Sequence, residues 1–197
     1  LILGPRADLS ELEVGEEFDA IVVMNYHGPV PERDKIIAGA FKKAKTALIL
    51  YFANDASKLL SSKIKDIYWE HEPDFIVMKS NQFSFQHAML RKENARTINA
   101  VDALLALGSG NFLQHCLYDV LCFNPESVKI IGLDFWVGST TYSKGYKIQE
   151  SDEKFPRYCF AGHNVFSNFL FAKALKKAGM LECSDVVASV LDLELEE

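Results

Sequence analysis

Short apolar runs alternate along the chain with segments of helical period. Five runs predict strands: Leu1–Leu3, Ala20–Met24, Ala47–Phe52, Phe75–Met78 and Val128–Leu133. Helices are predicted where apolar residues recur every three or four positions: Glu32–Lys43, Ala56–Lys65, Gly110–Phe123 and Val165–Ala178. The strand runs are apolar at consecutive positions, which is typical of strands covered on both faces. The alternation predicts one α/β domain, a mostly parallel sheet flanked by helices, over residues 1–197.

Polar or turn-forming residues follow each predicted strand: Gly4-Pro5-Arg6, Asn25, Asn54, Ser80-Asn81 and Asp134. Open parallel sheets bind ligands outside the carboxyl ends of their strands, so these residues are expected to line one crevice. The alternative is that they serve only as turn formers, because Asn, Ser and Gly are common in turns. Taken as a set, they favour a ligand.

Composition excludes several classes of protein. The net charge of -6 argues against a nucleic-acid partner, and the lysines near residues 42–45 and 173–177 are interpreted as solvated helix faces. The four cysteines form no CxxC pair; Cys116 and Cys122 fall in one predicted apolar helix, which predicts buried free thiols and a reducing cytosolic compartment. No apolar run is long enough for a membrane span, and no signal-peptide pattern is present.

Two familiar phosphate-binding patterns, G-x-G-x-x-G and G-x-x-x-x-G-K-[ST], are missing from the sequence. No metal ligand set is evident either, because the five histidines are scattered and no acidic pair follows a strand. Asp192 and Glu194 have a suitable spacing but lie in an acidic tail, where solvated charge is the simpler account. We therefore expect no metal and no cofactor.

Ser109 and Gly110 open the predicted helix Gly110–Phe123. Small residues at a helix start expose backbone N–H groups, and together with the helix dipole these groups favour an anion such as phosphate. The alternative is an ordinary helix cap.

Three segments resemble the sialyltransferases, both the animal type and the bacterial relatives that use CMP-activated sugars. Leu1–Arg6 followed by Phe18–Pro29, which contains Asn25, is similar to the large motif of that family. The segment from Ser109-Gly110 to Asp134-Phe135 is similar to the small motif. The last motif, a His that opens a helix, is matched by His163, although Asn168 stands where Glu is usual. The third motif has only an echo in Arg157–Phe160 and lacks its His, and no Cys before Cys116 is present for the disulfide of the animal enzymes.

The resemblance implies a Rossmann-like sheet of the sialyltransferase (GT-A variant) type. It also implies transfer of a 2-keto sugar acid, sialic acid or Kdo, from its CMP ester to a hydroxyl of a glycan or glycolipid acceptor. On this basis the nucleotide and its phosphate are assigned to Asn25, Ser109 and Gly110, above a first turn formed by Gly4 and Arg6. Arg6 has an alternative role, pairing with the sugar carboxylate. A single phosphate on the leaving group makes a metal unnecessary.

His163 is the candidate general base, because an imidazole titrates near neutrality. Its alternatives are a capping or buried structural histidine, and His27 is a weaker competitor for the role of base. Asp134 is a candidate to hold the base or the acceptor, or to act as nucleophile in a retaining enzyme; bonding of backbone amides is the simpler role. Tyr142 and Tyr146, in the loop 136–157, are candidates to stack on the acceptor sugar, unless this is an ordinary surface loop.

Two other functions stay open. One is a non-catalytic nucleotide- or glycan-binding module of the same fold within a larger polysaccharide- or lipopolysaccharide-assembly protein. The other is a different nucleotide-dependent enzyme on a doubly wound sheet. The apolar start at Leu1 and the acidic C-terminal segment predict a domain trimmed from a longer chain, with additional domains elsewhere. The expected location is cytoplasmic, including the inner face of a bacterial membrane.

Overall fold

The computed structural model describes residues 1–4, 6–24, 35, 39–40, 44–52, 74–79, 95–98, 112–133, 135 and 164–194. In this part of the chain one sheet contains seven strands: β1 (Ile2–Leu3), β2 (Phe18–Met24), β3 (Ala44–Phe52), β4 (Phe75–Lys79), β5 (Ala95–Ile98), β6 (Lys129–Ile131) and β7 (Glu182–Cys183). The described helices are the 3-10 helix η1 (Leu9–Glu11) and the α-helices α6 (Phe112–Leu121), α8 (Val165–Lys177) and α9 (Asp185–Leu191). None of them is long and apolar enough to cross a membrane.

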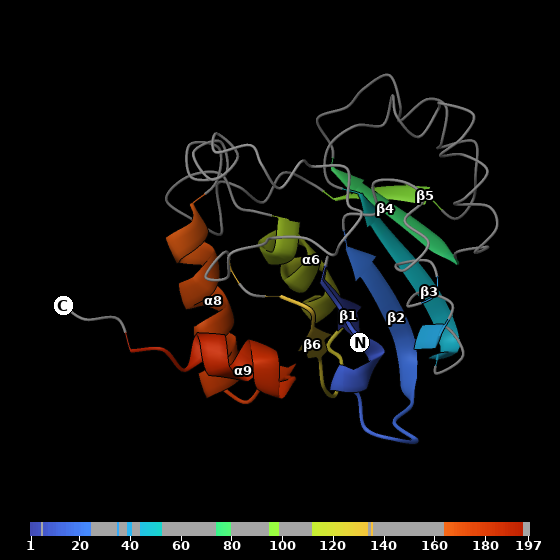
Figure 1. Cartoon of the computed structure of the whole chain (residues 1–197). Helices are drawn as coiled ribbons and strands as arrows, with labels where there is room; N and C mark the ends of the chain where they lie inside the picture. Colours follow the sequence, from blue (N-terminus) through green and yellow to red (C-terminus); the bar gives the residue numbers. More distant parts are fainter. Residues whose placement is uncertain are drawn as a thin grey trace, which may run out of the picture.

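The strands lie in the order β5-β4-β3-β2-β1-β6-β7, and every pair of neighbours is parallel. From β1 to β5 the chain adds strands in one direction; it then returns to the other side of β1 with β6 and continues to β7. The order therefore reverses between β1 and β6. In Figure 1 the strands point upward, and α6 and α8 both begin near this upper, carboxyl edge of the sheet.

The centre of the sheet is buried on both faces. Ile2 of β1 pairs with Val22 and Ile130, while the next residue, Leu3, pairs with Val23 and Ile131. These six side chains are at most 3% exposed, although neighbouring residues of a strand point to opposite faces. Ile2 shares a hydrophobic cluster with residues of α6, α8 and α9, so these helices cover its face. The prediction of strands covered on both faces is thus confirmed for β1, β2 and β6.

The connection between β1 and β2 spans residues 4–17. It contains η1 and no α-helix among its described residues. Asp8 caps η1 by accepting a bond from the Ser10 amide, and this bond lowers the pKa of the Asp8 carboxyl. Ala7 and Leu12 are buried, and the Leu9 side chain lies so close to Gly39 that a Cβ there would approach its Cδ1 to 2.4 Å.

The predicted elements and the described ones differ mainly at their ends. Strands β2 and β3 begin earlier than predicted, β6 is shorter, and α6 ends at Leu121 rather than at Phe123. The sequence did not predict η1, β5, β7 or α9. Of the predicted helix Glu32–Lys43 the structure describes three residues, all helical, and the predicted helix Ala56–Lys65 lies outside the described residues.

One cysteine prediction is wrong. Cys116 is fully buried in α6, and burial raises the pKa of its thiol. Cys122 is exposed, because α6 ends at Leu121 and the chain turns there.

The lysines of α8 were predicted to lie on a solvated helix face, but two of them bind residues at the end of α9. Lys173 donates to the Leu193 carbonyl at 2.6 Å and Lys176 forms an ion pair with Asp192 at 2.6 Å, so both fasten α8 to the end of α9.

Candidate ligand-binding edge between β1 and β6

The carboxyl ends of β1 and β6 are joined by backbone hydrogen bonds. The Gly4 amide donates to the Ile131 carbonyl at 2.9 Å, and the Arg6 amide donates to the Gly132 carbonyl at 3.0 Å. A third bond, from the Ala7 amide to the Gly4 carbonyl at 3.2 Å, closes a tight turn over residues 4–7. Gly4 and Arg6 therefore lie in one turn directly after β1, and Arg6 is exposed there.

Two glycines make this close approach possible. Gly132 has a φ of +71°, and a Cβ at this position would lie 1.9 Å from the Ala7 nitrogen. A Cβ on Gly4 would lie 2.3 Å from the Gly132 carbonyl oxygen. Both distances are far below van der Waals contact, so only glycine fits at either position without moving the backbone.

Beyond Gly132 the chain turns toward α8. Phe135 is buried and has a φ of +51°, an uncommon conformation for a bulky side chain. Its ring meets the ring of Phe169 edge to face, with centroids 5.8 Å apart. This contact holds the segment after β6 against the second turn of α8. Asp134 lies outside the described residues, but Leu133 and Phe135 on either side of it are described.

Helix α8 begins at Val165, two positions after His163, the candidate general base. Asn164 is its N-cap and accepts a bond from the Ser167 amide at 2.9 Å. Asn168, which replaces the Glu expected from the resemblance, is fully buried and donates to the Asn164 carbonyl at 2.7 Å. The described Asn168 thus stabilises the first turn of the helix. His163, the residue before the cap, lies outside the described residues.

Helix α6 carries buried polar side chains that the sequence analysis did not single out. Gln114 and His115, in its first turn, are 0% and 1% exposed, and Asp119 is 8% exposed. The sequence signal that could have indicated them is the Gln114-His115 pair inside an otherwise apolar helical run. Buried polar side chains therefore lie in the first turn of α6, at Gln114 and His115, and again near its end, at Asp119.

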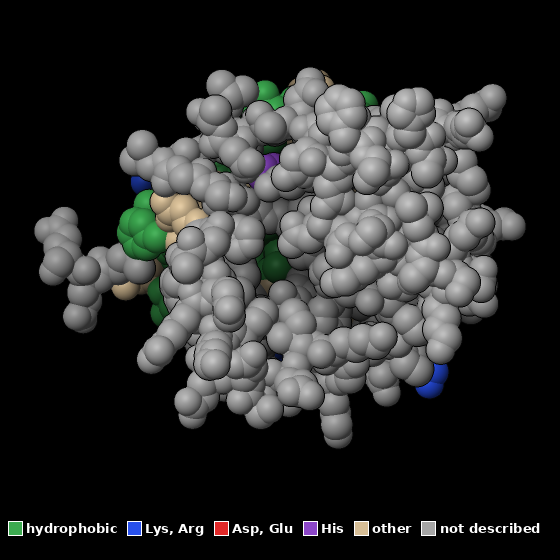
Figure 2. Space-filling model, turned by 90° about the horizontal axis from the view of Figure 1, so that it is seen from above, with side chains coloured by type: hydrophobic (Ala, Val, Ile, Leu, Met, Phe, Trp, Pro, Cys, Tyr) green, Lys and Arg blue, Asp and Glu red, His purple; other side chains and the backbone are tan. Residues whose placement is uncertain are grey.

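Most residues assigned to the site from the sequence lie outside the described part of the chain: Asn25, Ser109, Gly110, Asp134, Tyr142, Tyr146 and His163, and also His27. The structure thus brings together Gly4, Arg6 and the described neighbours of Asp134, with α6 and α8 beginning at the same edge. Figure 2 looks down on this edge, where some hydrophobic side chains of described residues are visible.

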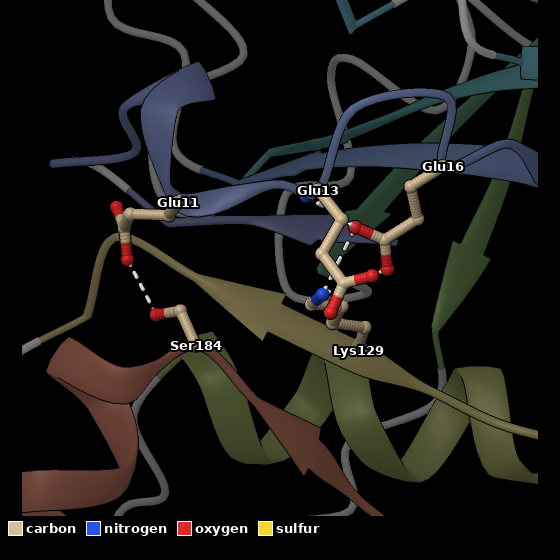
Figure 3. Close-up of polar contacts among 5 residues, drawn as sticks. All are labelled: Glu11, Glu13, Glu16, Lys129 and Ser184. Carbon is tan, nitrogen blue, oxygen red and sulfur yellow. Dashed lines mark hydrogen bonds and ion pairs between the residues drawn. The ribbon is translucent and has the colours of Figure 1, made fainter.

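Glu11 is a residue beside this edge that the sequence analysis missed. Its carboxylate accepts a hydrogen bond from the Gly132 amide, 121 positions away. It also accepts one from the Ser184 hydroxyl, 173 positions away (Figure 3). No local sequence pattern around a glutamate in a short connection predicts contacts with residues so far away in the chain.

The described residues contain no group of three or more His, Cys, Asp or Glu side chains that could hold a metal ion. Comparison with models of protein families, with curated proteins and with solved structures yields no match. The class that the fold defines is therefore a parallel α/β sheet whose strand order reverses between β1 and β6.

Proposed function

We propose that this chain is a sialyltransferase-like glycosyltransferase of the GT-A variant type. In this proposal it binds the CMP ester of a 2-keto sugar acid, sialic acid or Kdo, at the carboxyl edge between β1 and β6. It then transfers the sugar to a hydroxyl of a glycan acceptor.

The observation that supports the proposal best is the reversal of the strand order. Parallel α/β sheets bind ligands where their strand order reverses, because the connections leave that edge in opposite directions and open a crevice. Here the reversal pairs β1 with β6. These strands belong to the first and second segments that resemble sialyltransferase motifs, so segments more than a hundred residues apart meet at one place.

The helices add an electrostatic argument. Helices α6 and α8 both begin near this edge, and the positive ends of their dipoles favour an anionic ligand there. We assign the phosphate to Ser109 and Gly110 before α6, and the nucleotide to Asn25 above the turn of Gly4 and Arg6. One phosphate on the leaving group can be met by N–H groups and a few side chains, so no metal is required.

The transfer itself needs a base and a site for the acceptor. We assign the base to His163, which would take the proton of the acceptor hydroxyl as its oxygen bonds to the sugar C2 and the bond from C2 to the CMP phosphate oxygen breaks. In the sequence, His163 directly precedes Asn164, the N-cap of α8. Asp134 would orient the base or the acceptor, and Tyr142 and Tyr146 would stack on the acceptor sugar.

Isothermal titration with CMP, compared with UMP, GDP and NAD, tests the nucleotide assignment. We expect selective binding of CMP, and loss of that binding in Ser109→Trp with unchanged circular dichroism. Equal affinity for all four nucleotides, or none, would contradict the proposal.

A non-catalytic binding module is the competing function, and the uncharged Asn168 is the observation that favours it. Asn168 is, however, buried and bonded to the Asn164 carbonyl, which indicates a structural role for its side chain. The missing charge is therefore weak support for a non-catalytic module. Release of CMP from CMP-sialic acid or CMP-Kdo in the presence of glycan acceptors, with and without EDTA, separates the two functions. Binding of CMP without any transfer would favour the module.

A further inference from the structure

The connection between β1 and β2 is fastened to β6 by two carboxylates at opposite ends of the strand (Figure 3). At the amino end, Glu16 pairs with Lys129, with its two oxygens 2.7 and 3.0 Å from the lysine Nζ. At the carboxyl end, the partner is Glu11. The two glutamates belong to one short segment and bind one strand, but only Glu11 lies beside the candidate ligand-binding edge.

Glu11 accepts from three donors on three different segments. Its Oε1 accepts from the Asp8 amide at 3.1 Å, which completes the capping box of η1. Its Oε2 accepts from the Gly132 amide at 3.3 Å and from the Ser184 hydroxyl. Ser184 is the N-cap of α9, and its hydroxyl oxygen accepts from the Val187 amide at 3.4 Å. One carboxylate therefore joins the connection, the end of β6 and the start of α9.

The bond from the Gly132 amide to Glu11 holds the first residue after β6. Both backbone groups of Gly132 are bound by the connection, its carbonyl by the Arg6 amide and its amide by Glu11. The next residues lead to Phe135, whose positive φ and contact with Phe169 leave little conformational choice. Gly132 is thus held by the Glu11 carboxylate and the Arg6 amide, while Phe135 is held against Phe169 of α8.

We propose that Glu11 is a positioning residue for the ligand-binding edge. Its carboxylate holds Gly132, directly after β6, in the geometry that the ligand requires. This inference rests on the proposed function for the identity of the ligand, but the effect of Glu11 on the turn can be measured without any ligand.

Glu11→Gln is the informative variant. An ionised carboxylate only accepts hydrogen bonds, whereas the glutamine amide presents one accepting oxygen and an NH₂ group that donates. Three donors converge on Glu11, so the variant must leave at least one bond unmade and place donor against donor. The matched control is Glu16→Gln, which removes a carboxylate from the same segment at the other end of β6.

The measurement is hydrogen exchange followed by mass spectrometry, with CMP titration of the same proteins. In Glu11→Gln we expect exchange in the peptide 132–135 to rise by about tenfold, the scale of one lost charge-assisted hydrogen bond, and CMP affinity to fall by a similar factor. Glu16→Gln should leave both unchanged. If Glu11→Gln does not fold, Glu11→Asp keeps the charge, shortens the reach by one methylene and should show the same pattern.

Unchanged exchange at residues 132–135 in Glu11→Gln, or an equal rise in both variants, would overturn the positioning role. Faster exchange with unaltered CMP affinity would overturn its connection to the ligand. If the unmodified protein binds no CMP, the proposed function fails, and the exchange comparison alone still decides whether Glu11 holds the turn.

Discussion

Replacement of Gly132 by alanine should be among the most destabilising methyl additions at the glycines that the structure describes. Two effects combine at this position. A side chain would be forced to adopt a φ of +71°, and its Cβ would lie 1.9 Å from the Ala7 nitrogen and 2.1 Å from the Ala7 Cα. Both neighbours are backbone atoms, so no side-chain rotation can relieve the overlap.

The magnitude follows from adding these effects. An alanine in the left-handed region costs about 1–2 kcal/mol, partly offset because the unfolded chain loses freedom. Relief of the overlap must also separate Arg6 from the Gly132 carbonyl and Glu11 from its amide. These two bonds contribute about 0.5–1.5 and 1.5–3 kcal/mol respectively. We expect a loss of about 4 kcal/mol in the free energy of unfolding.

Other glycines in the chain provide matched controls. Gly179 has a φ of +72° and nothing within 4 Å of the place that an added Cβ would occupy, so Gly179→Ala should show the conformational cost alone, about 1 kcal/mol. Gly4 has no positive φ but lacks space, so Gly4→Ala should show the packing cost alone. Urea unfolding at 25 °C with linear extrapolation measures all three. Losses for Gly132→Ala and Gly179→Ala that agree within about 1 kcal/mol would refute the reasoning.

Three further predictions test other parts of the structure. Burial raises the pKa of the Cys183 thiol from 9.0 to about 11. Its thiolate fraction at pH 8, and therefore its rate of alkylation by iodoacetamide, should be roughly 100-fold lower than for an ordinary thiol. Peptide mass spectrometry that finds Cys183 as reactive as the exposed Cys122 would contradict this prediction. Asn168→Asp should lower the free energy of unfolding by about 2 kcal/mol at pH 7, because a carboxylate would face the Asn164 carbonyl. Burial raises the folded-state pKa of such a carboxyl above its unfolded value, so the loss should shrink as the pH falls toward 4, and a loss independent of pH in urea titrations would refute it. His163→Ala should lower kcat roughly 10²–10⁴-fold while CMP affinity is kept, and near-normal turnover of the folded variant would overturn its assignment as base.

The sequence predicted the centre of the sheet because burial on both faces leaves a simple mark. Ile2-Leu3 and Ile130-Ile131 are apolar at consecutive positions, and no other arrangement of a short strand explains such runs as well. Strand β7 left no such mark. It is two residues long, its Glu182 is exposed, and it is defined by pairing with β6 rather than by its own side chains.

Helix α9 could have been recognised from its sequence. Ser184 precedes it as a cap, Asp185 favours its positive end, and Val187 and Leu191 are buried four residues apart. It was not predicted because the acidic residues that follow it led to the interpretation of this region as a solvated acidic tail. The exposure of Cys122 depends on where α6 ends, and helix ends are set by local capping that the apolar pattern does not report.

For the candidate site, the sequence predicted which residues follow the strands but not which strands are neighbours in the sheet. The expectation that the turn after β1 and the segment after β6 lie together depended on a strand order that the sequence does not state. Glu11 was missed because its bonds to Gly132 and Ser184 arise from the folded arrangement of three segments, with no repeat or spacing to announce them.

The place of β1 in the sheet has a consequence for synthesis on the ribosome. Ile2 pairs with Val22, which follows within seconds of translation, and with Ile130, which requires over a hundred further residues. At about 5–20 residues per second, β1 waits on the order of ten seconds with one edge unpaired. During that interval its N–H and C=O groups and the apolar side chains beside them are open to other nascent chains. The same pairing that would create a crevice in the finished protein therefore makes the growing chain dependent on protection until β6 emerges.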